Sequence, residues 1–156
     1  MHLHRKLVTA ALAAGLFASS AIHAEEKRIR REDLPPAVEK TVAEQSKGAT
    51  IKGFSKEVEH GKTYYEAELT VNGHGRDISM AENGNIVEIE EEVALNSVPP
   101  AVNEALVKAA GSGKIIKVES LSKNGRLVAY EAVVQAGTKQ HEVRVGPDGK
   151  KLAHPE

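Results

Sequence analysis

Residues 64–73 alternate between two kinds of side chain and end in an Asn-Gly pair. The apolar set is Tyr65, Ala67, Leu69 and Val71, and the polar set is Tyr64, Glu66, Glu68 and Thr70. This period of two is typical of an antiparallel strand that buries one face and leaves the other in water. Asn72-Gly73 supplies the two residues with positive φ that a tight hairpin turn requires. The stretch therefore predicts a half-buried strand that ends in a hairpin.

The same signals return in the second half of the chain. There the alternating sets are Tyr130, Ala132 and Val134 against Glu131, Val133 and Gln135. Other motifs recur in the same order: Leu34-Pro35-Pro36-Ala37-Val38 as Val98-Pro99-Pro100-Ala101-Val102, His60-Gly61 as Asn124-Gly125, and Asn83-Gly84 as Asp148-Gly149. Because the turns agree in both position and type, we interpret the chain as an internal duplication.

Each copy begins with a helix signal. Prolines suit the first helical turn, whose N–H groups have no partner within the helix, and Asp33 or Ser97 stands in the capping position. After each helix come four segments with strand character, separated by turn residues. The predicted fold class is therefore α+β, with two tandem repeats at 33–94 and 95–156. In each repeat we expect one helix packed on a four-stranded antiparallel meander.

The first 24 residues have the features of a secretory signal peptide. Arg5 and Lys6 precede an apolar run at 7–18 that is too short to span a bilayer, and small residues follow. We expect cleavage after Ala24 or Ala21, which leaves an exposed, mobile, charged leader at 25–32. The mature protein is then periplasmic or secreted. No second apolar run follows, so we expect no stable membrane insertion after cleavage.

Charge and composition exclude several classes of function. Beyond residue 24 the chain keeps 19 of its 21 basic residues and all 22 acidic ones, a formal net charge of −3. This balance provides no basic footprint for nucleic acid or anionic lipid. The chain has no cysteine, which excludes disulfides and thiol catalysis. With no tryptophan and 3% aromatic residues, the core must consist mainly of aliphatic side chains.

The order of these motifs resembles the PepSY-like family of small exported bacterial proteins. The resemblance covers residues 33–154 and is carried by Leu34-Pro35-Pro36-Ala37-Val38, Tyr65-Glu66-Ala67, Asn83-Gly84 and their copies. That family is related in fold to the β-lactamase inhibitor protein and to PepSY modules in the propeptides of secreted metallopeptidases. The resemblance implies a tandem α+β protein whose sheets bind another protein, for example to inhibit a peptidase. It implies no catalytic residue.

No catalytic or cofactor motif emerges from the spacing of residues, so we predict a non-enzymatic protein without a cofactor. Gly111-Ser112-Gly113-Lys114 lacks the hydroxyl residue of a phosphate loop and follows a helix instead of a strand. Glu88, Glu90 and Glu92 share a face if their strand continues, and such carboxylates suit a hard cation. The alternative is a charged strand end that discourages edge pairing, and we predict no metal site.

The polar face of the sheet is the remaining candidate for a site. It comprises Tyr64, Glu66, Glu68, Thr70 and Ser79 in the first copy and Glu131, Gln135 and Arg144 in the second. Tyrosine and arginine are frequent in binding hot spots, and Tyr64 and Arg144 are the examples on this face. We therefore expect an unidentified protein partner to bind there. The alternatives are a plain solvated face, or a small ligand or metal ion bound at the acidic strand end 88–92.

Overall fold

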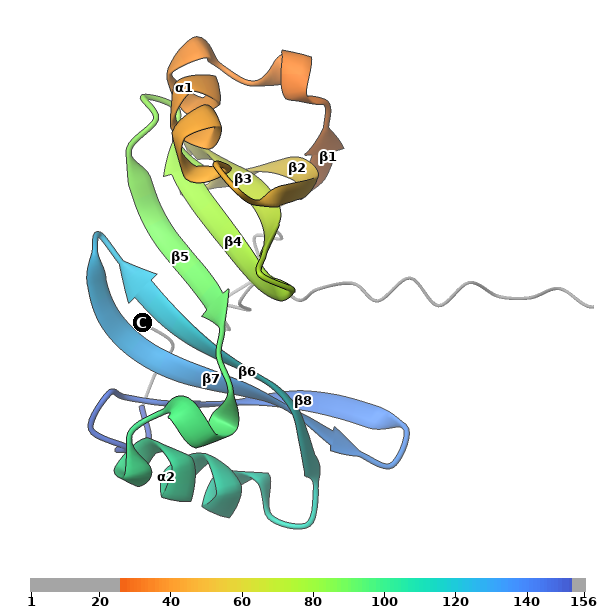
Figure 1. The fold of residues 1–156 in the computed structure, drawn as a ribbon, viewed down its shortest axis with the longest axis vertical. Coiled ribbons are helices and arrows are strands. Elements are labelled where there is room, and N and C mark those ends of the chain that lie inside the picture. The colour runs from red at the N-terminus through yellow and green to blue at the C-terminus, as the bar shows by residue number, and fades with distance from the viewer. Residues whose placement is uncertain (1–25, 153–156) are drawn as a thin grey trace, which may run out of the picture.

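The computed structural model describes residues 26–152 and places them in an α+β fold (Figure 1). Its elements follow in the order β1 (Lys27–Ile29), η1 (Arg31–Asp33), α1 (Pro36–Gln45), β2 (Thr50–Glu59), β3 (Lys62–Val71), β4 (His74–Ala81), β5 (Ile86–Glu92), η2 (Leu95–Ser97), α2 (Pro100–Ala110), β6 (Lys114–Lys123), β7 (Arg126–Ala136) and β8 (Lys139–Val145). Among these residues, no helix is long and apolar enough to span a bilayer. The predicted signal peptide at 1–24 lies outside the described residues.

All eight strands belong to one antiparallel sheet, in which each strand pairs with its neighbour in sequence, from β1 at one edge to β8 at the other. The sequence left open whether the strands before and after residue 94 share a sheet. They do, because β5 pairs with β6 from Glu88 opposite Lys123 to Glu92 opposite Glu119. One continuous sheet therefore links both halves of the chain.

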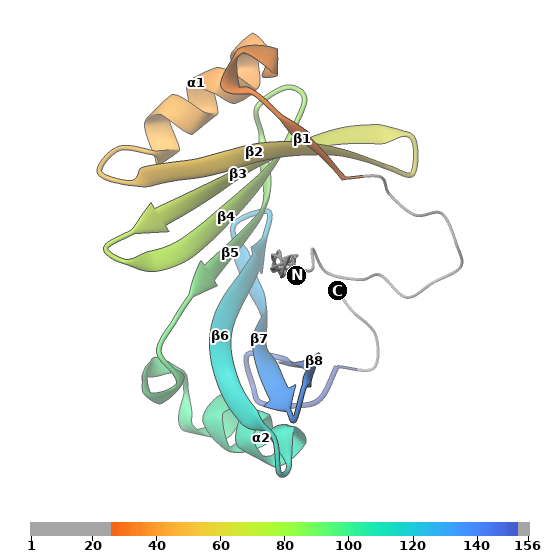
Figure 2. The ribbon, with the colours of Figure 1, turned by 90° about the vertical axis from the view of Figure 1, so that its right-hand side faces the viewer.

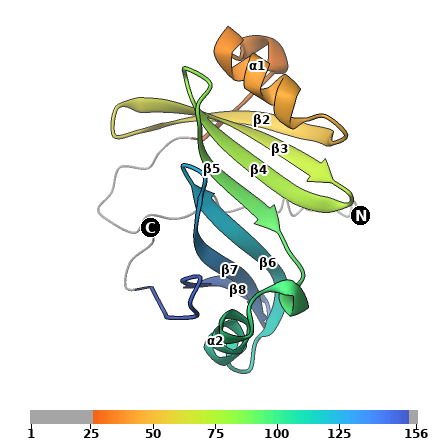
Figure 3. The ribbon, with the colours of Figure 1, turned by 60° about the vertical axis from the view of Figure 1, so that its left-hand side comes forward.

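The sheet is strongly twisted and curved, so its first and last strands lie at opposite ends of the molecule (Figure 2). Helix α1 packs at one end and α2 at the other, and both lie on the outer, convex side (Figure 3). The opposite face is concave and turns toward the middle of the molecule. No helix among residues 26–152 covers this concave face.

The convex face is apolar and packs against the helices in two clusters. Val38 and Val42 of α1, both at most 1% exposed, pack with buried side chains of β2, β3 and β4, namely Phe54, Tyr65, Ala67, Leu69, Ile78 and Met80. Val102 and Leu106 of α2 pack with Val118, Ala132 and Val145. The predicted apolar face of β3 is thus confirmed for Tyr65, Ala67 and Leu69.

Two glycine turns hold the first turns of the helices against the sheet in the same way. Gly84, between β4 and β5, has a φ of +82°, and a Cβ there would lie 2.4 Å from the carbonyl oxygen of Ala37 in α1. Gly149, after β8, has a φ of +79°, and its Cβ would lie 2.5 Å from the carbonyl oxygen of Ala101 in α2. The positive φ and the close approach both require glycine. Each turn therefore helps to position one helix.

The number of strands differs from the prediction in both halves. Residues 27–29, inside the leader expected to be mobile, form the edge strand β1, in which Ile29 lies opposite Phe54 and packs against the first core cluster. In the second half, three strands follow α2. Where a fourth was predicted, the described residues form an isolated bridge between Val145 and Lys151. The segment around Lys151 could pair only with β8, at the edge of the sheet. Its counterpart in the first half, β5, is held by β4 on one side and by β6 on the other.

Two local expectations are wrong for identifiable reasons. Asp33 accepts a hydrogen bond from the backbone N–H of Arg30 at 3.1 Å and closes η1, so it does not cap α1. Helix α1 begins at Pro36 without a side-chain cap. Ser97 donates from Oγ to the carbonyl oxygen of Ala94 at 2.7 Å, and helix α2 likewise begins at Pro100 without a side-chain cap.

Candidate functional site

The concave face is built from alternate residues of successive strands, and the strand pairing arranges them in rows. One row contains Ser55, Glu66, Ser79 and Glu88, a second contains Glu68, Asp77, Glu90 and Leu121, and a third contains Glu92, Glu119, Glu131 and Arg144. Neighbours in a row lie on strands about 4.8 Å apart. Because the second and third rows cross from β5 to β6, carboxylates from both halves share one surface.

The five site residues predicted in the first half all lie on this concave face. Tyr64, Glu66, Glu68 and Thr70 occupy alternate positions of β3, and Ser79 lies opposite Glu66 on β4. A shallow hollow at this end of the face is lined by Glu26, Ser55, Glu57, Tyr64, Tyr65, Glu66 and Ser79. The structure therefore brings the first set of predicted residues together as one patch.

The residues predicted in the second half do not form one patch. Arg144 donates from Nε to Oε2 of Glu131 at 2.6 Å, and the two side chains are 16% and 10% exposed. This pair is largely buried, whereas the sequence predicted that both side chains belong to an exposed partner-binding face. Gln135 lies roughly 13 Å further along β7. There it donates to the carbonyl of Gly137 and accepts from Gln140 at 2.8 Å.

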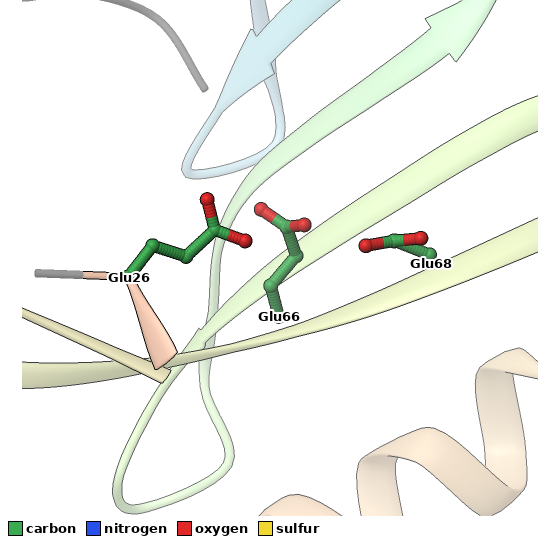
Figure 4. Close-up of side chains that lie close together, drawn as sticks. All are labelled: Glu26, Glu66 and Glu68. Atoms are coloured by element: carbon green, nitrogen blue, oxygen red, sulfur yellow. The ribbon is translucent and has the colours of Figure 1, made fainter. Parts of the chain in front are cut away.

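A first acidic cluster consists of Glu26, Glu66 and Glu68, whose carboxylates lie on the same side of the strands (Figure 4). One oxygen from each lies within 4.8 Å of the others. Arg28 of β1 reaches this cluster and forms an ion pair with Glu68. Its guanidinium passes over Gly53 of β2, where a Cβ would lie 2.6 Å from Nη1. The absence of a side chain at Gly53 therefore leaves room for the guanidinium of Arg28.

A second acidic cluster joins the two halves of the chain. It consists of Asp77 on β4, Glu90 on β5 and Glu119 on β6, again with one oxygen from each within 4.8 Å of the others. Lys117 Nζ lies 2.6 Å from Oε1 of Glu119. This cluster exists because β5 pairs with β6, so it depends on the continuity of the sheet.

Burial makes the carboxyl groups of both clusters hard to ionise. The pKa of Glu66 is raised to about 8, mainly by burial and then by nearby carboxylates, among which Asp77 has the largest effect. The pKa of Glu90 is also raised to about 8, by burial and then by Glu119 and other carboxylates. Burial raises the pKa of Asp77 to about 6, although Lys117 opposes this shift. These groups bind protons more readily than solvated carboxylates do.

A similar arrangement lies beside the buried pair on β7 and β8. The pKa of Glu142 is raised to about 7. Burial is the main cause, and contact with the carboxyl group of Glu131 contributes in the same direction. Arg144 opposes the shift.

Comparison with known proteins gives matches in structure only. No protein-family model matches the sequence, and no curated protein matches it significantly. A DUF2874-family protein from Bacteroides ovatus aligns with a TM-score of 0.59 and 19% identity, over 76% of this chain and 84% of its own. A BLIP-like protein from Bacteroides fragilis aligns with a TM-score of 0.57 and 23% identity, over 78% and 86%. The fold is BLIP-like.

A third solved structure agrees with this assignment. It is a candidate periplasmic protein from Bacteroides eggerthii, with a TM-score of 0.63 and 17% identity over 78% of this chain and 88% of its own. At these identities the likeness concerns the fold alone. In this chain, the BLIP-like fold exposes a concave sheet face on which the acidic clusters lie.

The acidic strand end at 88–92 does not act as a unit in this BLIP-like fold. Glu88 lies 3.7 Å from Nζ of Lys123, and Glu92 accepts a hydrogen bond from the backbone N–H of Gly75 at 3.0 Å. Glu91 alternates onto the convex side, opposite Arg76. Among these glutamates, Glu90 alone joins a cluster of three carboxylates within the described chain.

Sequence reasoning missed several acidic residues of the concave face, namely Glu26, Glu57, Asp77, Glu119 and Glu142. Alternation within single strands contains part of the signal, since Asp77 precedes the buried Ile78 and Glu119 follows the buried Val118. Their meeting across β5 and β6 has no such signal, because it depends on which strands pair. Glu26 was assigned to the leader and joins the face through β1.

Proposed function

We propose that this chain is an exported, non-enzymatic binding protein that contacts another protein through the concave face of its sheet. The observation that carries this proposal is the position of the helices. Both lie on the convex side, so residues 26–152 leave the concave face open across both halves. An extended face of this kind suits an interface of about 800 Å² per partner. An exported peptidase or an envelope protein fits this role.

The proposal includes the finer description of the fold as PepSY-like, built from two tandem repeats at 33–94 and 95–156 after a charged leader at 25–32. Matching turns support it. Asn83 and Asp148 each accept a hydrogen bond at 3.0 Å from the backbone N–H two residues later. His60 and Asn124, each followed by glycine, have the same positive φ of 49°. Such agreement in detail is what duplication of one unit produces.

Export is part of the same proposal. The signal features of residues 1–24 support secretion, and the Bacteroides eggerthii structure bears a periplasmic description. The name of the Bacteroides fragilis structure refers to an inhibitor of β-lactamase, which supports protein binding as the mode of action. Mass spectrometry of the exported chain should give a first residue at or near Glu25. A full-length product in the cytoplasm would contradict export.

Site-specific photo-cross-linking tests the proposed face. A photoreactive residue at Ser79, on the concave face, should capture a protein partner in the cells that produce the chain. The same residue at Val107, which is 50% exposed on α2, is the matched control on the convex side. Capture from position 107 and none from position 79 would assign the interface to the helices.

A second candidate function is the binding of a divalent cation. Two clusters of three carboxylates on the concave face favour it, because their oxygens converge to within 4.8 Å. Calorimetry with calcium and with zinc separates this candidate from the first. Stoichiometric binding that Glu90→Gln abolishes and Glu44→Gln on α1 preserves would support a metal site. Heat of dilution alone would leave protein binding as the function.

A further inference from the structure

Six carboxylates form a continuous stripe along the concave face, which we name the acidic stripe. Its members are Glu66 and Glu68 on β3, Asp77 on β4, Glu90 on β5, Glu119 on β6 and Glu131 on β7. Glu68, Asp77 and Glu90 lie directly opposite one another on successive strands, as do Glu119 and Glu131. Glu90 and Glu119 meet within the second acidic cluster. The stripe therefore crosses five strands and both halves of the chain.

Half of the stripe is already neutralised by the chain itself. Arg28 pairs with Glu68, Lys117 with Glu119 and Arg144 with Glu131. The other three members are Glu66, Asp77 and Glu90, and within residues 26–152 none of them has an ion-pair partner within 4 Å. They lie on the consecutive strands β3, β4 and β5, so the carboxyl groups without a basic partner are together in the middle of the face.

The environment of these three carboxylates favours a cation. After burial, the largest influences on Glu66 and Glu90 are other carboxylates, which raise their pKa, while Arg28 and Lys117 lie near enough to interact with Glu66 and Glu90 respectively. A cation placed between them would lower those pKa values, and the gain would be larger than at a solvated site because the groups are half-buried.

Arg28 indicates what kind of cation fits. It belongs to the short edge strand β1, crosses β2 through the opening at Gly53, and ends against Glu68. Its side chain remains 64% exposed, so the guanidinium lies on the surface of the face. The chain thus binds one of its own basic side chains in the first acidic cluster, beside the carboxyl group of Glu66.

We propose that the concave face recognises an extended basic polypeptide segment whose lysine or arginine side chains pair with Glu66, Asp77 and Glu90. The inference rests on the proposed protein-binding function and adds the chemistry of the partner. Glu66 and Glu90 lie two strands apart, roughly 10 Å, and same-side residues of an extended peptide repeat at roughly 6.6 Å. Two or three basic residues at alternate positions therefore match the length of this part of the stripe.

The dimensions favour side-chain cations over a divalent ion. A calcium ion takes six to eight oxygen ligands in a closed shell. Each acidic cluster supplies three carboxylates from one surface, and one of those three is already paired to Arg28 or Lys117. The two that remain in each cluster suit a single ammonium or guanidinium group, which needs acceptors on one side only.

Fluorescence anisotropy with a labelled octapeptide of alternating lysine and serine tests the proposal. We expect saturable binding that weakens about tenfold in the double variant Glu66→Gln with Glu90→Gln. The matched control is Glu44→Gln with Glu104→Gln, which removes the same charge from exposed positions on α1 and α2. Equal weakening in both double variants, or no saturable binding, would overturn the proposal. Thermal melts of all variants verify that each is folded.

Calorimetry in two buffers provides an independent readout. Binding at pH 7 should release protons, because an adjacent cation lowers the pKa of Glu66 and Glu90 below the solution pH. The measured heat then depends on the ionisation enthalpy of the buffer. Binding without proton release would put the peptide elsewhere on the surface. Competition by calcium at equal charge concentration, without competition by sodium, would favour a metal site instead.

The experiments separate this inference from the function on which it rests. A partner that cross-links at Ser79 but binds the Glu66→Gln, Glu90→Gln variant with unchanged affinity would refute a basic segment and leave protein binding intact. Peptide binding to the acidic stripe, with no partner captured from Ser79, would refute the protein-binding function while the face retains its preference for cations.

Discussion

The two faces of strand β3 have opposite energetic roles, although their residues alternate along ten positions of one strand. On the convex face, Tyr65 and Leu69 are nearly fully buried against α1, and this apolar burial stabilises the fold. On the concave face, Glu66 and Glu68 are partly buried beside other carboxylates, and burial of charge costs free energy. The convex face therefore stabilises the fold. On the concave face the neighbouring carboxylates repel one another, and a cationic partner would reduce that repulsion.

Removal of a large side chain from the convex face should have the largest effect. Tyr65 is 9% exposed in the first core cluster, so Tyr65→Ala should lower the free energy of unfolding by roughly 3–5 kcal/mol. Glu66→Ala, one position away, should cost little. Urea denaturation measures both. The half-buried Tyr130 should give a smaller loss than Tyr65. A larger loss for Glu66→Ala than for Tyr65→Ala would reverse the assignment of the faces.

A single methyl group between sheet and helix should have the next largest effect. Gly84→Ala introduces a Cβ 2.4 Å from the carbonyl oxygen of Ala37, in addition to the strain of a positive φ. Gly61→Ala is the control, since its φ is +75° and no atom lies within 4 Å of the added Cβ. The clash should cost about 1–3 kcal/mol beyond the control. Equal unfolding midpoints for the two variants would mean that the helix yields easily.

The pH dependence of stability should reveal the concave face. The folded pKa values of Glu66 and Glu90, about 8, lie above the value near 4.3 of an unfolded chain. The folded protein therefore binds more protons between these values, so stability falls as pH rises from about 5 to about 8. Asp77 and Glu142 act in the same direction. Thermal melts in matched ionic strength measure this fall; a maximum near pH 8 would contradict it.

One neutral substitution should remove part of that pH dependence. Glu66→Gln keeps the shape of the side chain without the charge, so it should raise the melting temperature at pH 8.5 and change little at pH 5, where Glu66 is already protonated. Glu44→Gln, on the exposed side of α1, should change neither. The difference between the two variants at pH 8.5 isolates the cost of the concave carboxylate. A lower melting temperature for Glu66→Gln would mean that the carboxylate is stabilising.

The ion pair of Arg28 should have the smallest effect on stability. The guanidinium is 64% exposed, and exposed pairs contribute at most about 1 kcal/mol. Arg28→Gln should therefore leave the urea midpoint nearly unchanged at moderate salt. The same variant should strengthen binding of the lysine–serine octapeptide, because it frees Glu68. Marked destabilisation would mean that β1 depends on this pair instead of on Ile29.

Much of this architecture was accessible from local sequence patterns. The alternation in β3 and β7, the prolines that open the helices, and the Asn-Gly and Asp-Gly turns report on the backbone within a few residues. The apolar face of β3 and the turns at Gly84 and Gly149 were therefore predicted correctly. The patterns failed in the charged segment before α1, where the apolar contact of Ile29 with the first core cluster places residues 27–29 in the sheet as β1.

The candidate site was predictable only in its first half. Tyr64, Glu66, Glu68 and Ser79 share a face because of alternation along β3 and direct pairing with β4, which the hairpin turn implies. Glu131 and Arg144 also followed from alternation, but their burial as a pair did not. Side chains from β6 and β8 flank them, and the curvature of the sheet sets how much water remains there.

The order of amino acids alone defined the central strands, the apolar face of β3 and the positions of the glycine turns, because these depend on period, proline and glycine. The pairing of β5 with β6 required the tertiary structure, since no local signal specifies which strands meet after an intervening helix. That pairing turns separate acidic faces into one acidic stripe. It also brings Asp77, Glu90 and Glu119 together from three strands, because residues far apart in the sequence become neighbours only through strand pairing.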